Sequence, residues 1–283
     1  YEYKTALHPL INDDYTAAQK EEDVRLLQAI YDSFTGEIAP ARGMKLEELK
    51  TKLNAVPYIG EEARKAGFVD KLGFDIEAED AAKAKAGAGA EIVDFSEYAE
   101  HAGSAYAKGE AIALIEGDGM VVDGKDEGGL FGPSGVLAGD TVSKAILEAA
   151  DDKNVKAIVF RVNSPGGSAT ASDQVWYAIE RAQKKGKPVV INMSGVAASG
   201  GYWVAMGADK IIAEPTTITG SIGVVGGKLI LKGLYQKLGI NVGELSVGSD
   251  MQHMFSVQHP FSPAEFLALH KAFDAVYGDF TRK

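Results

Sequence analysis

Ser199 lies in a stretch whose residue types suit nucleophilic chemistry. Residues 193–203 read MSGVAASGGYW, so two alanines and two glycines flank the serine and two large aromatic side chains follow it. The apolar run PVVIN at 188–192 is typical of a buried parallel strand, and the stretch after the serine starts like a helix. Such a strand-to-helix turn directs unpaired backbone N–H groups at one point, which favours developing negative charge. The alternative is a small-residue turn packed against a neighbouring helix.

A second glycine turn lies one strand and one helix earlier in the chain. The segment RVNSPGGSA at 161–169 ends a predicted strand and opens a helix. There Gly166 and Gly167 would let backbone N–H groups approach a ligand carbonyl closely, and the N–H of Gly200 would supply a second donor. Two such donors predict an oxyanion hole for acyl transfer. The alternative for the PGG sequence by itself is a tight turn.

A serine hydroxyl is a weak nucleophile at neutral pH and needs a base. Histidine is the usual partner, and the chain contains five: His8, His101, His253, His259 and His270. None lies in a motif that demands it, and each is better explained as an ordinary surface or packing residue.

The elements that would position these residues alternate short apolar runs with helical patterns. Strand-like runs occupy 111–117, 155–163, 188–192, 210–215 and 217–226, and helical patterns occupy 141–150 and 172–186. This alternation is typical of right-handed βαβ units with a parallel sheet. Eight glycines between Gly117 and Gly139 predict an exposed loop after the first of these strands.

The N-terminal part of the chain has a different pattern. Residues 1–80 are predicted to be mostly helical, with helices near 17–37 and at 46–53. Residues 81–105 begin with a low-complexity Ala/Gly/Lys stretch typical of a linker. The βα pattern then fills 106–283. A shift of 246 residues lays AIYDSFT at 29–35 on AVYGDFT at 275–281, with coinciding helical stripes. We therefore interpret the chain as the tail of one repeat followed by most of a second.

Composition excludes several classes of protein. The chain has 283 residues, a formal charge of −11 and a pI near 5.0, which argue against a nucleic-acid partner. The absence of cysteine excludes disulfides, thiolate metal sites and a cysteine nucleophile. No apolar run approaches the roughly 18 residues of a membrane span. The chain begins without methionine and stops within a predicted helix, which indicates a piece of a longer protein.

Four segments together resemble the signal peptide peptidase A, or protease IV, family. They are VKAIVFRVNSPGGS, MSGVAASGGYW, EPTTITGSIGV and GEEARKAGFVDKLG. The resemblance implies an α/β ClpP/crotonase-like βαβ superhelix and a serine protease that uses a Ser-Lys dyad. Long bacterial members carry two tandem copies of the fold. On this basis residues 1–80 would be the C-terminal helical part of the first copy, and 106–283 the second copy with the nucleophile.

The resemblance also assigns roles to individual residues. Ser199 matches the nucleophile, and Lys4 in YEYKTALHPL resembles the general base. Ser221 in TGSIG matches a serine that holds the lysine amine, while Gly167 and Gly200 match the oxyanion hole. A lysine acts as a base near pH 7 only if burial lowers its pKa far below the usual ~10.4. The alternatives are a solvated lysine at position 4 and a plain turn at 221.

In the register of the repeat, Lys4 falls on Asp250, so the second copy is predicted to lack a base of its own. One dyad would then form from the tail of the first copy and the core of the second. If that is wrong, His253, His259 or Lys228 become candidate bases.

The family further implies a substrate class, partners and a location. Substrates would be cleaved signal peptides and other short apolar or unfolded polypeptides, with no cofactor and no metal. The protein would form a homo-oligomeric ring at the periplasmic face of the bacterial inner membrane, held there by a segment outside this chain. Two other functions stay open: a crotonase-type acyl-CoA enzyme, for which the acidic chain offers no obvious phosphate site, and a catalytically inactive scaffold of the same fold.

Overall fold

The computed structural model describes residues 2–102, 109–126, 135–245 and 250–283. These residues divide into two compact units. One unit joins Tyr1–Glu22 to Glu110–Lys283, and the other comprises Asp23–Gly109. The first 22 residues therefore group with the C-terminal sheet although the whole second unit separates them in sequence. The predicted boundaries between the two repeats, at residues 80 and 105, are a different division of the chain and stay a prediction.

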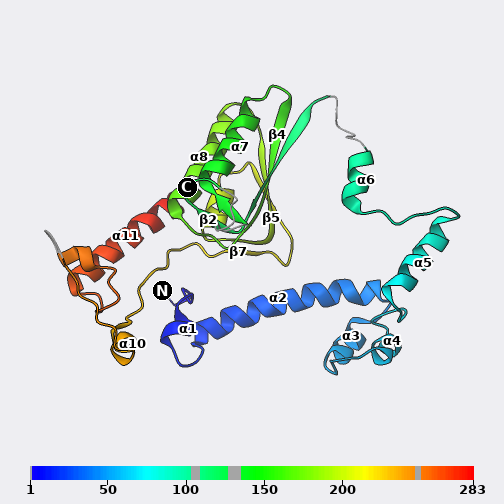
Figure 1. Ribbon diagram of the computed structural model, residues 1–283, viewed down its shortest axis with the longest axis horizontal. Coiled ribbons are helices and arrows are strands. Elements are labelled where there is room, and N and C mark those ends of the chain that lie inside the picture. The colour runs from blue at the N-terminus through cyan, green and yellow to red at the C-terminus, as the bar shows by residue number, and fades with distance from the viewer. Residues whose placement is uncertain (1, 103–108, 127–134, 246–249) are drawn as a thin grey trace. The chain divides into compact units, whose positions relative to one another are not determined.

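The first unit is built on a parallel sheet, as the βα alternation predicts (Figure 1). Four strands pair in the order β1-β4-β5-β6, and β7 pairs with the far end of β5. Their bounds are β1 Ala111–Asp118, β4 Val155–Ser164, β5 Val189–Ala198, β6 Lys210–Ala213 and β7 Ile218–Gly220.

Two helices cover one face of this sheet and create the core. They are α7 (Gly139–Asp151) and α8 (Ala169–Lys184), and both lie along the sheet in Figure 1. Apolar side chains at helical spacing on α8 meet the strand residues that point to the same side. The largest fully buried side chains include Phe160, Ile146, Ile158, Ile179 and Ile191. Each contributes about 1.5–3 kcal/mol by leaving water, which makes this the rigid part of the unit.

The glycine-rich segment between β1 and α7 is partly ordered as strands, so the prediction of an exposed loop is wrong at its two ends. β2 (Met120–Val122) and β3 (Val136–Ala138) form a short parallel pair. Val121 and Leu137 are buried in the core because they sit under β1 and α8. Residues 127–134 lie outside the described residues.

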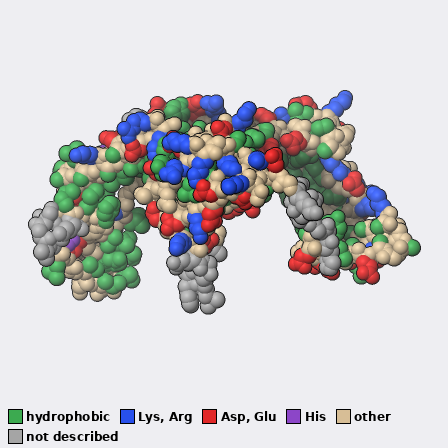
Figure 2. All heavy atoms as spheres, turned by 90° about the horizontal axis from the view of Figure 1, so that it is seen from above, with side chains coloured by type: hydrophobic (Ala, Val, Ile, Leu, Met, Phe, Trp, Pro, Cys, Tyr) green, Lys and Arg blue, Asp and Glu red, His purple; other side chains and the backbone are tan. Residues whose placement is uncertain are grey.

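The remainder of the first unit is a set of short helices and one long one. These are α1 (His8–Ile11), α9 (Gly200–Ala205), α10 (Lys232–Lys237), a 3-10 helix (Asp250–His253) and α11 (Pro263–Arg282). Hydrophobic side chains gather at the surface around α10 and the start of α11, at the left of Figure 2. They include Leu229, Leu234, Phe255, Phe266 and Leu267.

The second unit is helical, which confirms the helices predicted near 17–37 and at 46–53. Its helices are α2 (Ala17–Ala41), which starts in the first unit, α3 (Leu46–Leu53), α4 (Glu61–Ala66), α5 (Asp75–Ala86) and α6 (Phe95–Ala102). The predicted linker is therefore helical up to Ala86 and again from Phe95. Arg42, directly after α2, forms an ion pair with Asp70, which follows α4; Arg42 Nη2 lies 2.9 Å from Asp70 Oδ1. None of the helices in the described part of the chain is long and apolar enough to cross a membrane.

Candidate active site

Ser199 occupies the turn between β5 and α9, which confirms the predicted strand-to-helix turn. Its backbone has φ 52° and ψ −120°, a region that side-chain-bearing residues rarely adopt. Ser221 (φ 49°) is the other such residue in the described ranges. Conformations of this kind cost about 1–3 kcal/mol and persist where surrounding contacts hold them. The Ser199 N–H supplies one such contact by donating to the Gly220 carbonyl at 3.0 Å.

The two glycine turns pack directly against each other, so the pairing predicted from sequence occurs. A Cβ added to Gly166 would lie 2.7 Å from both the amide nitrogen of Gly200 and the Cβ of Ser199. A Cβ on Gly200 would lie 3.0 Å from the amide nitrogen of Gly167. Because neither gap admits a side chain, these positions require glycine.

The amides of Gly167 and Gly200 are available to a ligand. Strand β2 forms hydrogen bonds with the residues on either side of Gly167. Val121 N–H donates to Gly166 O at 2.9 Å, and Ser168 N–H donates to Val121 O at 2.8 Å. In this parallel bridge the Gly167 N–H points away from β2. Neither the Gly167 nor the Gly200 N–H donates a hydrogen bond to any residue that the structure describes. Two adjacent free donors suit an anionic oxygen.

Buried serines around the PGG turn were missed by the sequence analysis. Ser164 is fully buried, and its Oγ accepts from the Gly166 N–H at 3.1 Å. Ser172 Oγ donates to Ser168 O at 2.7 Å, and Ser168 Oγ caps α8 by accepting from Ala171 N–H. The Ser-x-Gly spacing and the serine ahead of the helix are sequence signals for such turns and caps. These bonds fix the loop that carries Gly167.

Lys4 lies beside the segment that follows Ser221. Its Nζ donates to the Ile222 carbonyl and sits 5.4 Å from the centre of the Tyr277 ring. A Cβ on Gly223 would approach Nζ to 3.0 Å, so this glycine makes room for the amine. Lys4 is exposed. The desolvation expected of a lysine base is therefore not supplied by the described residues.

The segment 220–222 connects the lysine to the serine. Gly220 O accepts from Ser199, and Ile222 O accepts from Lys4. Within the described ranges, however, no hydrogen bond joins Lys4 to Ser199, and the hydroxyls of Ser199 and Ser221 have no hydrogen-bond partner. The structure thus brings the predicted residues to one place without closing the contact between Nζ and Oγ.

The aromatic residues that follow Ser199 hold α9 in place. Trp203 is buried and stacks on Phe280 of α11 with ring centres 4.5 Å apart. Lys283 lies over the Trp176 ring of α8 at 4.2 Å, and partial burial there lowers the pKa of its ammonium. The end of α11 therefore braces the helix that begins directly after the candidate nucleophile.

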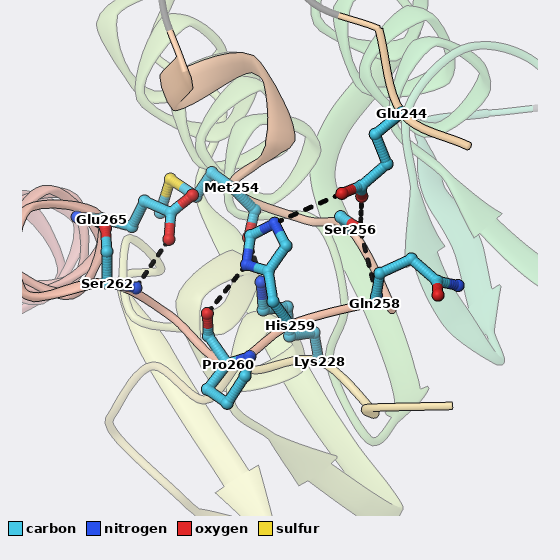
Figure 3. Close-up of polar contacts among 9 residues, drawn as sticks. All are labelled: Lys228, Glu244, Met254, Ser256, Gln258, His259, Pro260, Ser262 and Glu265. Atoms are coloured by element: carbon cyan, nitrogen blue, oxygen red, sulfur yellow. Dashed lines mark hydrogen bonds and ion pairs between the residues drawn. The ribbon is translucent and has the colours of Figure 1, made fainter. Parts of the chain in front are cut away.

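Two of the alternative bases, His259 and Lys228, form contacts away from Ser199 (Figure 3). His259 Nδ1 lies 2.9 Å from the Pro260 carbonyl, and Nε2 lies 3.8 Å from Glu244. Lys228 Nζ donates to the Met254 carbonyl at 2.8 Å. His8 contacts Thr16, and His270 packs on Phe266. Among the histidines whose side chains the structure describes, none forms a hydrogen bond with Ser199. The side chain of His101 lies outside that part.

The described residues contain no group of three or more His, Asp or Glu side chains arranged to bind a metal ion.

Two models of known protein families match the chain. The model of peptidase family S49 matches residues 1–89 and 181–283, and that of Clp protease matches residues 137–218. The second match runs from within β3 to the first residue of β7 and includes both glycine turns. The predicted α/β fold of the ClpP/crotonase type, with its parallel sheet, is confirmed.

Individual relatives extend this similarity along the chain. "Protease 4" of Haemophilus influenzae is 32% identical over 267 residues, covering 86% of this chain and 41% of that protein. "Serine protease SPPA, chloroplastic" of Arabidopsis thaliana is 31% identical over 288 residues, covering 99% and 42%. Among solved structures, a mutant of the "1510-N membrane-bound stomatin-specific protease" is 18% identical with a TM-score of 0.32, covering 61% and 64%. The chain thus spans about two-fifths of the length of the two curated relatives.

Proposed function

This chain belongs to peptidase family S49, and on that premise we propose that it is a serine endopeptidase with Ser199 and Lys4 as its dyad. The observation that carries the proposal is the pair of free N–H groups, on Gly167 and Gly200, beside the strained Ser199 turn. Strained backbone and unsatisfied donors persist at sites where they serve a reaction.

The proposed reaction is acyl transfer. Lys4 Nζ takes the proton from Ser199 Oγ as Oγ attacks a peptide carbonyl carbon, and the N–H groups of Gly167 and Gly200 hold the oxyanion. When the tetrahedral intermediate collapses, the C–N bond breaks and the Lys4 ammonium protonates the leaving amine. A water molecule then gives a proton to Lys4 and attacks the acyl ester carbon. The ester C–Oγ bond breaks, and Lys4 returns the proton to Ser199 Oγ.

Ser221 would hold the amine between these steps. Its strained turn precedes Ile222, whose carbonyl accepts from Lys4. A movement of Nζ from that carbonyl toward Ser199 would close the dyad, with the Ser221 hydroxyl as an alternative partner. The proposed roles of all five site residues thus use contacts within the first unit.

For substrates we propose short apolar or unfolded polypeptides, including cleaved signal peptides. β7 pairs with β5 alone among the described strands, so its other edge could bind an extended peptide by strand addition. Ile218 on β7 and Val225 beyond it expose apolar surface nearby. A relative from Enterococcus faecium carries the name "Putative signal peptide peptidase SppA", which supports this substrate class.

The oligomeric ring and the membrane location also belong to the proposal. The exposed hydrophobic side chains around α10 support contacts with other chains. Attachment to the bacterial inner membrane would depend on a segment other than the helices described here.

Labelling with a fluorophosphonate tests the nucleophile directly. We expect one adduct on Ser199 in the folded chain, located by peptide mapping, and its loss together with peptide hydrolysis in Ser199→Ala. Ser194→Ala is the matched control, because Ser194 lies five residues earlier in the same segment and contacts Arg161. If Ser199 stays unlabelled in protein that converts an acyl-CoA substrate, the acyl-CoA alternative is supported, because that reaction needs the two N–H donors but no serine. An unlabelled and inactive protein would support the scaffold.

A further inference from the structure

The ring of Tyr277 lies under the ammonium of Lys4, with Nζ 5.4 Å from the ring centre. This distance falls within the roughly 6 Å at which a cation is attracted to an aromatic face. Tyr277 is half-buried on α11, far in sequence from every segment that the sequence analysis associated with catalysis. We propose that Tyr277 is a positioning residue for Lys4, an inference that rests on the proposed dyad.

The fold ties this ring to the nucleophile. Tyr277 and Phe280 are three residues apart on α11 and so share one face of the helix. Phe280 is only 3% exposed and stacks on Trp203 of α9, the helix that begins directly after Ser199. The same helix turn therefore holds Lys4 through one aromatic ring and braces the Ser199 turn through the next. The distance between the Lys4 amine and the Ser199 hydroxyl therefore depends on the position of α11.

The ring also supplies an electrostatic effect at the right step. Positive charge appears on Nζ when the neutral amine takes the Ser199 proton, and the negative face of the ring stabilises that charge. The Ile222 carbonyl accepts from the same atom, so the ring and the carbonyl together define where the ammonium forms. A flexible lysine side chain at an exposed position has few other restraints.

An internal control exists in the second unit. Tyr31 corresponds to Tyr277 in the repeated pattern, and Lys50 Nζ lies 5.8 Å from its ring centre. This pair has a similar ring–amine distance, and the described residues of its own unit contain no serine turn like those at 199 and 221. A ring–lysine contact that only stabilised the fold would give similar results at both places.

The experiment measures kcat and KM of the full chain on an apolar peptide, on the alkaline plateau of the pH profile. We expect Tyr277→Leu to lower kcat about 5- to 30-fold with KM changed less than about 2-fold, as for the loss of a cation–π contact made in the transition state. Tyr277→Phe keeps the ring face and should retain kcat within about 2-fold. Phe273→Leu, on the same helix but packed near Gly226, and Tyr31→Leu should leave kcat unchanged.

A double-mutant cycle separates this proposal from the dyad itself. If Lys4→Ala removes hydrolysis, Tyr277→Leu should cause no further loss in that background, since its effect acts through the amine. Full activity of Lys4→Ala would overturn the proposed dyad. An inactive Lys4→Ala combined with full kcat in Tyr277→Leu would overturn the role of Tyr277 alone. An equal loss in Tyr277→Phe would show that the hydroxyl acts and not the ring face, which would overturn the proposed cation–π contact. An equal loss in Phe273→Leu would show that α11 acts only through stability.

Discussion

Helices α2 and α11 carry the same seven-residue pattern, yet the two copies have opposite environments. AIYDSFT at 29–35 corresponds to AVYGDFT at 275–281. Phe280 in α11 is 3% exposed and stacks on Trp203, whereas its counterpart Phe34 in α2 is 56% exposed. Both tyrosines have a lysine over the ring, but only Lys4 lies beside a serine turn.

The difference shows that a helical stripe specifies which residues can be buried and not whether they are. The repeated apolar spacing produces a helix with one apolar face in both places. Burial then requires a partner, and in the first unit the core places Trp203 against the end of α11. Function follows the same rule, because a lysine over a tyrosine becomes a candidate base only beside an acyl-transfer site.

The largest expected effect separates the two lysines. Lys4→Ala should lower kcat by about 10²–10⁴-fold, the contribution of a general base, while Lys50→Ala leaves it unchanged. Lys4→Arg should fail as well, because guanidinium does not give up its proton near neutral pH. Initial rates of peptide cleavage between pH 7 and 9 measure this. Near-full activity of Lys4→Ala would direct attention to His259 or Lys228.

The next effect separates the two phenylalanines by stability. Phe280→Ala should cost about 3–5 kcal/mol because it opens a cavity against Trp203, and Phe34→Ala should change stability by less than about 0.5 kcal/mol. The chain has two tryptophans, Trp176 and Trp203, both in the first unit. Their fluorescence during urea unfolding therefore follows that unit, and circular dichroism follows both. Equal costs for the two changes would contradict the comparison.

The smallest effect concerns the starts of the two helices. Ser262 Oγ accepts from Glu265 N–H at 3.3 Å, and Glu265 accepts from Ser262 N–H at 2.7 Å (Figure 3). Thr16 Oγ1 accepts from Gln19 N–H at 3.2 Å at the start of α2. Removing either cap, by Ser262→Ala or Thr16→Ala, should cost about 1 kcal/mol. Thermal unfolding measures both.

The cap of α11 should depend on pH through the Glu265 carboxylate. The Ser262 N–H, with smaller contributions from Lys228 and His259, holds the pKa of Glu265 below its ordinary value. The folded protein therefore binds this proton less readily than the unfolded chain. The stability contributed by the carboxylate is present above the unfolded pKa and is lost as the pH falls through the folded pKa. Glu265→Gln should flatten the acid side of the stability profile, and Gln19→Ala should shift the whole profile evenly. A profile unchanged in Glu265→Gln would contradict this assignment.

Local sequence was sufficient for the parts of the site built from consecutive residues. The turn at Ser199, the PGG turn, the parallel sheet and the helices near 17–37 and 46–53 follow from apolar runs and glycines a few residues apart. The roles of Ser199, Lys4, Ser221, Gly167 and Gly200 came from the family resemblance and stay predictions. Ser164 and Ser172 had weak local signals, since a serine near a turn has many ordinary uses.

The turns and the positions that must be glycine can be predicted from the sequence, because they depend on backbone conformation over a few residues. Three features depend on tertiary packing: β2 bonds to the residues on either side of Gly167, Gly220 accepts from Ser199, and Ile222 and Tyr277 lie beside Lys4. The lysine and the tyrosine are separated by most of the chain, and each sits among ordinary residues in sequence. Their meeting depends on how the sheet, α9 and α11 pack, and no periodicity within one segment carries that information.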